Sequence, residues 1–185
     1  MSAAIEQLIR EHDLILRMLE ALEQAVTRLE TGKAVPPEVF LKAVDFIQNF
    51  ADRYHHAKEE DILFKRMAEK GVPVEGGPIG VMLHEHNLGR QYRQALEQGA
   101  RKLEQGNREA VALIVENARG YIQLLQQHIL KENNVLYPMA ENLIPPEIME
   151  KMAEAFIRAG KEVIDENVEE HYRKVVEEVE SAVKS

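Results

Sequence analysis

The stretch Gln126–Pro138, which reads QQHILKENNVLYP, carries a polar pair on an otherwise apolar helical stripe. The stripe advances in steps of three and four residues, as the buried face of a bundle helix does. His128 and Glu132 occupy positions where an aliphatic side chain is expected, and burying a carboxylate without a partner is costly. A His and a Glu one turn apart therefore predict a metal ion. The inward positions are Val111, Ile114, Ala118, Tyr121, Leu125, His128, Glu132, Val135 and Met139.

The same phrase occurs earlier in the chain, in the segment 55–64, which reads HHAKEEDILF. His55 and Glu59 there have the spacing of His128 and Glu132, and both pairs are followed by Leu and an aromatic residue. One inward His–Glu pair has structural explanations, but two matched pairs indicate a site.

The composition of the chain is that of an all-helical protein. Its 185 residues include 23 Lys and Arg against 32 Asp and Glu, a formal net charge of −9, with no basic cluster, so we expect no nucleic-acid partner. Cysteine is lacking, which excludes disulfides and thiolate metal sites. No signal peptide and no apolar run long enough to span a bilayer is found, so we expect a cytoplasmic protein without a membrane partner.

The turn-forming residues predict an all-α, up-down-up-down four-helix bundle with a C-terminal helical extension. Residues 1–143 form the bundle with its dinuclear metal site, and residues 144–185 form the appendage, which packs across the bundle or makes a homodimer. Within the appendage a helix over 147–159 ends at Gly160, and a second begins at 162 with the inward residues Val168, Tyr172, Val175, Val179 and Ala182. The bundle helices are expected at about 2–30, 36–70, 78–105 and 107–143, with 71–78 as a loop.

Each bundle helix contributes one inward histidine: His12, His55, His86 and His128. Counted from the helix ends at a rise of ~1.5 Å per residue, the four lie at nearly the same level. With Glu59 and Glu132 they offer six ligands, which favours two transition-metal ions over a single zinc. We expect two iron ions bridged by both carboxylates, with manganese or a mixed pair as the alternative.

Neighbouring histidines leave the register open at two places. His56 and Glu60 repeat the spacing of His55 and Glu59 one residue later, but the stripe before them is polar, so we place them at the rim. His84 competes with His86 and is a candidate for an extra ligand. His171 is expected in solvent. We also expect three tyrosines to lie near the ligand helices as core residues within reach of a hydrogen bond to the site: Tyr54, Tyr121 and Tyr137.

These motifs resemble the hemerythrin-like, HHE cation-binding family over about residues 5–140. The resemblance implies a four-helix bundle with a non-haem di-iron centre, an oxo or hydroxo bridge and two bridging carboxylates. It also implies that the ligands are His12, His55, Glu59, His86, His128 and Glu132. The oxygen carriers of the family have a His-x3-His pair on the third helix, where Arg90 follows His86 here, and His-x4-Asp on the fourth. One usual His ligand thus lacks an obvious counterpart unless His84 or His56 supplies it.

The expected function is binding or reaction of a small oxidant or diatomic, namely O2, NO or peroxide, at the di-iron centre. The departures from the oxygen carriers put reversible O2 transport in doubt. The alternatives are iron or oxygen sensing, iron donation of the iron–sulfur repair type, and enzymatic reduction of peroxide or NO. The sequence leaves the choice between carrier, sensor and enzyme open.

Overall fold

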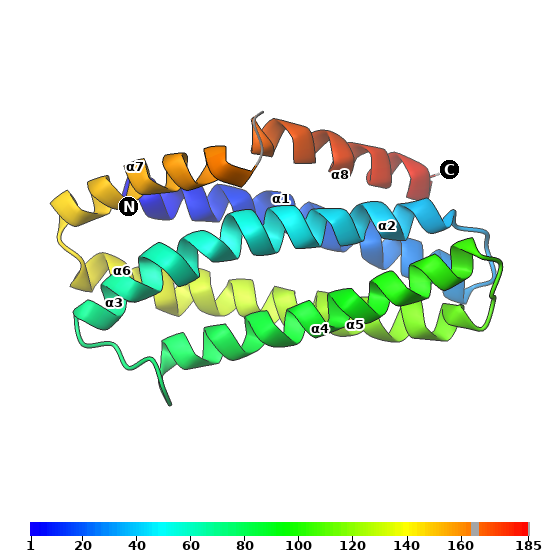
Figure 1. The fold of residues 1–185 in the computed structure, drawn as a ribbon, viewed down its shortest axis with the longest axis horizontal. Coiled ribbons are helices and arrows are strands. Elements are labelled where there is room, and N and C mark those ends of the chain that lie inside the picture. Colours follow the sequence, from blue (N-terminus) through cyan, green and yellow to red (C-terminus); the bar gives the residue numbers. More distant parts are fainter. Residues whose placement is uncertain (164–166, 185) are drawn as a thin grey trace.

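The computed structural model describes residues 1–163 and 167–184, and these residues form helices and turns without a β-strand. Four long helical rods run antiparallel in the up-down-up-down order that the sequence predicts (Figure 1). The first rod is α1 (Ala3–Glu30) and the third is α4 (Pro78–Glu104). The second comprises α2 (Pro37–Phe46), η1 (Ile47–His56), η2 (Glu59–Leu63) and α3 (Phe64–Glu69). The fourth comprises α5 (Ala110–Lys131), η3 (Glu132–Leu136) and α6 (Tyr137–Leu143).

The ends of the rods are marked by residues whose side chain or backbone conformation favours the start or the end of a helix. The Ser2 side chain accepts a hydrogen bond from the Ile5 amide and caps α1, and Gly32 follows α1 with φ of 78°, a conformation that glycine adopts without strain. Pro37 and Pro78 each occupy a first helical turn, where the missing N–H costs nothing. The predicted rod boundaries are confirmed to within three residues, and the largest difference is the start of the fourth rod, expected at 107 and found at Ala110.

The segments η1, η2 and η3 are π-helical, with hydrogen bonds from residue i to i+5 and a wider turn than an α-helix. Each wider turn delays the inward stripe by about one residue. Val135, which a regular helix would point inward, is 53% exposed, and Leu136 is buried in its place. On the second rod a constant helical period after His55 and Glu59 predicts Ile62 on the inner face, but Leu63 is buried there and Ile62 only partly. The predicted stripe is therefore wrong after each His–Glu pair, because it assumed a constant helical period.

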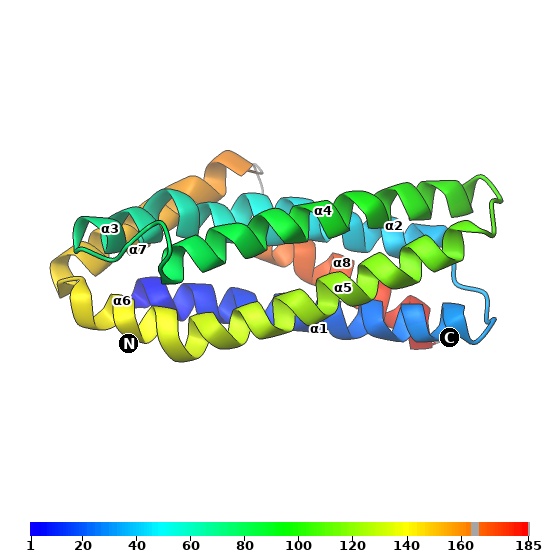
Figure 2. The same ribbon diagram turned by 90° about the horizontal axis from the view of Figure 1, so that it is seen from below.

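The C-terminal extension forms a further layer over α1 and the second rod (Figures 1 and 2). It consists of α7 (Pro146–Val163) and α8 (Val168–Lys184). The predicted helix end at Gly160 is wrong: α7 continues to Val163, since one glycine costs a helix only about 1 kcal/mol relative to alanine. The predicted start at 162 is also wrong, because residues 162 and 163 belong to α7; residues 164–166 lie outside the described residues. The buried residues of α8 are Val168, Tyr172, Val176, Val179 and Val183.

The core consists of two apolar clusters separated by a polar layer. One cluster packs the middle of the bundle with α8, and the other packs the end near α3 and α6 with α7. On α1, Leu8 belongs to the second cluster and Ile15 to the first, with His12 between them. The extension thus contributes apolar residues to both clusters. No helix in the described ranges is both apolar and long enough to traverse a bilayer.

Candidate metal centre

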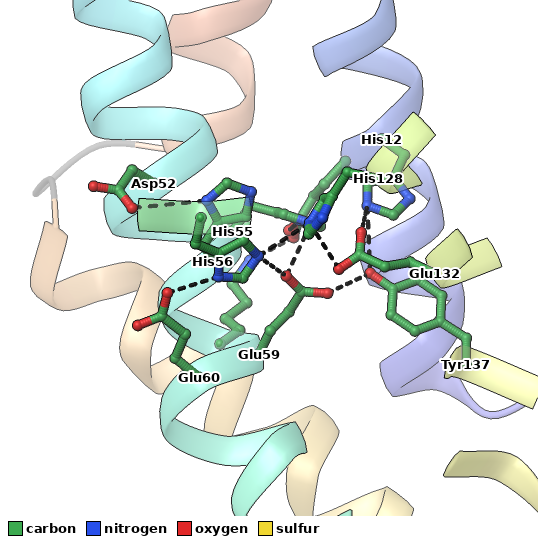
Figure 3. Close-up of polar contacts among 12 residues, drawn as sticks. His12, Asp52, His55, His56, Glu59, Glu60, His128, Glu132 and Tyr137 are labelled. Carbon is green, nitrogen blue, oxygen red and sulfur yellow. Dashed lines mark hydrogen bonds and ion pairs between the residues drawn. The ribbon is translucent and has the colours of Figure 1, made fainter. Parts of the chain in front are cut away.

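Seven side chains from all four rods converge in the polar layer between the two clusters (Figure 3). They fall into two groups, and in each the ligand atoms lie within 4.8 Å of one another. We call His56, Glu59, His86 and His128 the four-donor group, and His12, His55 and Glu132 the three-donor group. All seven residues are at most 5% exposed.

The two carboxylates reach between the groups. Glu132 places Oε1 3.0 Å from His128 Nε2 and Oε2 3.2 Å from His12 Nε2. Glu59 Oε2 lies 3.6 Å from His86 Nε2 and 3.8 Å from His55 Nε2. Because each carboxylate faces a histidine of each group, both are placed to bridge two ions. Figure 3 shows the two carboxylates side by side among the imidazoles.

Four of the five histidines turn Nε2 inward because a polar group holds Nδ1 from outside. His12 donates to Asn133 Oδ1 at 2.9 Å, and His55 donates to Glu11 Oε2 at 2.9 Å. His86 donates to Glu60 at 2.7 Å and His128 to Glu85 at 2.8 Å, whereas His56 Nδ1 makes no hydrogen bond and lies 3.7 Å from Asp52 Oδ1. Outer hydrogen bonds of this kind fix the tautomer and the ring orientation of metal-binding histidines.

A cation stands behind each of the outer carboxylates. Lys58 Nζ contacts Glu11, and Lys131 Nζ contacts Glu85. Arg90 serves two partners, Glu60 at 2.7 Å and Asp52 at 2.7 Å. Lys58 and Glu11 are both fully buried, and the ammonium also lies 3.1 Å from the centre of the Tyr54 ring. Three cations thus offset most of the charge of the four outer carboxylates that orient the imidazoles.

The inner atoms lack the partners that burial demands. Among the described residues, His55 Nε2, Glu59 Oε2 and both carboxylate oxygens of Glu132 are buried and make no hydrogen bond. An unsatisfied buried polar atom costs about 1–3 kcal/mol, and more when it is charged. Five imidazoles and two carboxylates that converge with free lone pairs fit a pair of transition-metal ions.

Burial and mutual proximity also shift the acidities of these groups. Burial, together with the charge of Glu132, raises the pKa of Glu59 well above its usual value. Burial acts in the same direction on Glu132, but His128 and His12 outweigh it and lower the pKa of this carboxyl. Burial and the neighbouring imidazoles lower the pKa of His56 to about 3. Burial and the neighbouring donors therefore favour the neutral forms of Glu59 and His56 and the charged form of Glu132.

The structure corrects one predicted register. His56 was placed at the rim, but it is 5% exposed and belongs to the four-donor group together with Glu59. The reason is η1, whose wide turn brings both His55 and His56 to the inner face. Glu60 lies at the rim as expected, where it holds His86. His84 is exposed and belongs to neither group. Of the two candidates for a fifth inner imidazole, His84 and His56, the structure therefore places His56 beside the other donors.

The outer partners of the histidines were not identified from the sequence. Glu11, Glu85 and Asn133 each lie on another rod than the histidine they hold, although each is the neighbour in sequence of an inner donor. Tyr137 was expected to be a core residue within reach of a hydrogen bond to the site, and this is confirmed: its hydroxyl donates to Glu59 Oε1 at 2.7 Å and lies 3.3 Å from His12 Nε2. Burial and the two inner carboxylates raise the pKa of this phenol.

A narrow pocket reaches the four-donor group from outside. Its space is about 10 Å³, and its lining includes His56, His86, Gly89 and Arg90. A volume of this size holds about one water molecule. The polar layer is therefore closed to large molecules on this side.

Comparison with known proteins points to one family. The Hemerythrin HHE cation binding domain matches residues 3–140, three quarters of the chain. Uncharacterized proteins of Mycobacterium tuberculosis and Mycobacterium bovis are 24% identical to this chain over 156 residues. The match covers 83% of this chain and 59% of theirs, so the chain spans about three fifths of the length of these relatives. No solved structure gives a significant match.

Proposed function

This chain belongs to the hemerythrin HHE cation-binding family, and from that premise we propose that it holds two iron ions in the polar layer and uses them to bind or react with O2, NO or peroxide. The observation that carries the proposal is the convergence of seven buried donors, among which His55 Nε2, Glu59 Oε2 and both carboxylate oxygens of Glu132 have no hydrogen-bond partner. Mixed imidazole and carboxylate ligation suits iron, with manganese as the alternative metal.

The two donor groups would each bind one of the two ions. His56, His86 and His128 would hold one ion, and His12 and His55 the other. Glu59 and Glu132 each face histidines of both groups and would bridge the two. Iron supplies redox chemistry and open coordination positions. The outer carboxylates keep each imidazole aimed inward, so that the donors are in place before a metal arrives.

The surroundings restrict what reaches the centre. Apolar clusters cover the polar layer on both sides, and the pocket beside His56 and His86 admits one water-sized molecule. A diatomic or peroxide fits that limit, whereas an organic substrate does not. This supports chemistry on a small oxidant rather than on a larger metabolite.

Two measurements test the proposal. The protein is loaded anaerobically with a ferrous salt, and its metal content and optical spectrum are recorded after oxidation. We expect two irons per chain and charge-transfer absorption from the ferric pair. A protein that takes up a single ion, or zinc in preference to iron, would overturn the di-iron assignment.

The second measurement separates binding from turnover. The reduced, iron-loaded protein is mixed with O2, NO or peroxide and followed by stopped-flow absorption. A stable adduct that reverses on removal of the gas marks a carrier or sensor, and continuing consumption of the oxidant in the presence of a reductant marks an enzyme. No reaction with any of the three would contradict the proposed function.

A further inference from the structure

Each inner glutamate is followed five residues later by an aromatic residue, and the two aromatic residues differ by one hydroxyl group. Phe64 comes five residues after Glu59 and Tyr137 five residues after Glu132. The Phe64 ring stacks on His86 with 6.0 Å between ring centres and 19° between planes. The Tyr137 ring stacks on His12 with 5.6 Å and 9°. Each aromatic ring thus covers a histidine of a different group, and the two rings differ by a hydroxyl.

The hydroxyl lies beside the group with fewer donors. With both carboxylates bridging, the ion beside Phe64 would have five donors among the described residues, whereas the ion beside Tyr137 would have four. The Tyr137 oxygen is 3.3 Å from His12 Nε2, closer than the 4.8 Å within which the donors of a group lie. It is also 1% exposed, so it faces the polar layer and not the solvent (Figure 3).

The backbone explains how Tyr137 comes to this position. It follows η3 directly, and the i→i+5 turn of a π-helix carries the fifth residue back over the first. In a regular α-helix the residue five positions after Glu132 would point well away from it. The π-helical turn therefore places a phenol oxygen and a carboxylate from one helix on the same side of the site.

We propose that the phenolate oxygen of Tyr137 is a fifth donor to the ion of the three-donor group, beside its three donors and the bridging carboxylate of Glu59. When the ion binds, the phenol O–H bond breaks, a metal–oxygen bond forms, and the proton passes to the solvent. The hydroxyl now donates to Glu59 Oε1, so the ion replaces a proton at a position already surrounded by ligand atoms. An anionic oxygen donor favours the ferric state of that ion over the ferrous state. This inference rests on the proposed function, because it requires iron in the polar layer.

The test uses the optical signature of ferric phenolate. Wild-type protein is loaded with a ferrous salt without oxygen, oxidised with ferricyanide, and examined by visible absorption and resonance Raman spectroscopy. We expect a visible charge-transfer band with enhanced phenolate ring vibrations, which shift when the protein is made with ring-deuterated tyrosine. Tyr137→Phe should lose both the band and the vibrations. The matched control is Tyr121→Phe, an equally buried tyrosine outside both groups, which should keep them.

The outcomes separate this inference from the function on which it rests. Wild-type protein that binds two irons without a phenolate signature overturns the role of Tyr137 and leaves the di-iron proposal intact. A signature that survives in Tyr137→Phe also overturns it. Wild-type protein that binds no iron overturns both. If Tyr137→Phe fails to fold, the wild-type spectrum with deuterated tyrosine, compared with that of Tyr121→Phe, still decides.

Discussion

The second and fourth rods each contribute a His–Glu pair next to π-helical turns, whereas α1 and α4 each contribute one donor histidine on a regular α-helix. The regular helices therefore add one donor apiece, His12 and His86. The π-helical rods add five donors between them, because the wide turn lets successive residues share the inner face. His55 and His56, adjacent in sequence, are both buried for this reason.

The two kinds of rod differ in backbone geometry at the level of the polar layer. A π-helical turn inside an α-helix is rare and is frequently found at functional sites. Here all three π segments lie at the polar layer or next to it. Five of the seven donors lie within these segments or on the rods that contain them. The predictions below change residues within these π-helical segments and compare them with controls.

The first prediction concerns the last two residues of η3, the π-helical segment of the fourth rod. Leu136→Ala should lower the free energy of unfolding by about 2–5 kcal/mol, since it empties a fully buried position. Val135→Ala, one residue earlier and 53% exposed, should change it by less than about 0.5 kcal/mol. Urea unfolding of the two variants measures both values. The reverse order would mean that this rod is a regular α-helix past Glu132.

The second prediction concerns Glu132, the carboxylate of the fourth rod that we propose bridges the two ions. An ion present at 100 times its dissociation constant adds about 2.7 kcal/mol to stability. Glu132→Ala should lose most of this metal-dependent gain, because both of its oxygens face histidines of the two groups. Thermal unfolding with and without ferrous ion, together with metal analysis, checks it. Glu116→Ala, at an exposed position of α5, is the control and should keep the full gain. Retention of both ions by Glu132→Ala would exclude a bridging role.

Much of the fold follows from the sequence because local chemistry sets it. Gly32 and Pro37 end and begin rods for backbone reasons that any chain obeys. His12 and His86 were placed inward by a constant helical period, and both lie on helices that keep that period. These parts of the site needed no knowledge of tertiary contacts.

The rest of the site depends on contacts between distant residues. His56 was misplaced because the π-helical turn changes the period within η1, and propensities give no sign of it. Glu11 reaches His55 and Lys58 from another rod, across 44 and 47 residues of sequence. A buried Lys–Glu pair of this kind forms only after the rods have packed. The residues that hold the outer nitrogens of the histidines therefore come together only in the folded protein, and the spacing of residues along one helix does not identify which histidine each one holds.

The third prediction compares two histidines that the sequence ranked similarly. His56→Ala should weaken binding of ferrous ion by about 10–100-fold, by analogy with the loss of residues that support metal ligands. His84→Ala should leave the affinity unchanged, since His84 is exposed and outside both groups. Metal titration of the two variants under anaerobic conditions gives both constants. Equal affinities would return His56 to the rim, where the regular period placed it.

The last prediction concerns the acid stability of the metal-free protein, where His56 on η1 and His128 on α5 act in opposite directions. The pKa of His56 is lowered to about 3 by burial and its neighbouring imidazoles, whereas an unfolded His titrates near 6.5. Between these values the unfolded chain takes up a proton that the folded chain refuses. Stability should therefore fall as the pH drops below about 6.5, by up to about 1.4 kcal/mol per pH unit from this residue.

His128 sets the other limb of the pH profile. Burial opposes its protonation, but Glu132 and Glu85 outweigh burial and raise its pKa to about 9. Its contribution is complete below about 6.5 and is lost as the pH rises through 9. These two residues alone place the maximum stability of the metal-free protein near pH 6.5. Urea unfolding measured from pH 4 to pH 10 tests this pH optimum. The free energy of unfolding should change by up to about 1.4 kcal/mol per pH unit for each proton taken up or released. His56→Ala should flatten the acid limb only; an unchanged acid limb would show that His56 is protonated in the folded protein and does not face the polar layer as a neutral donor.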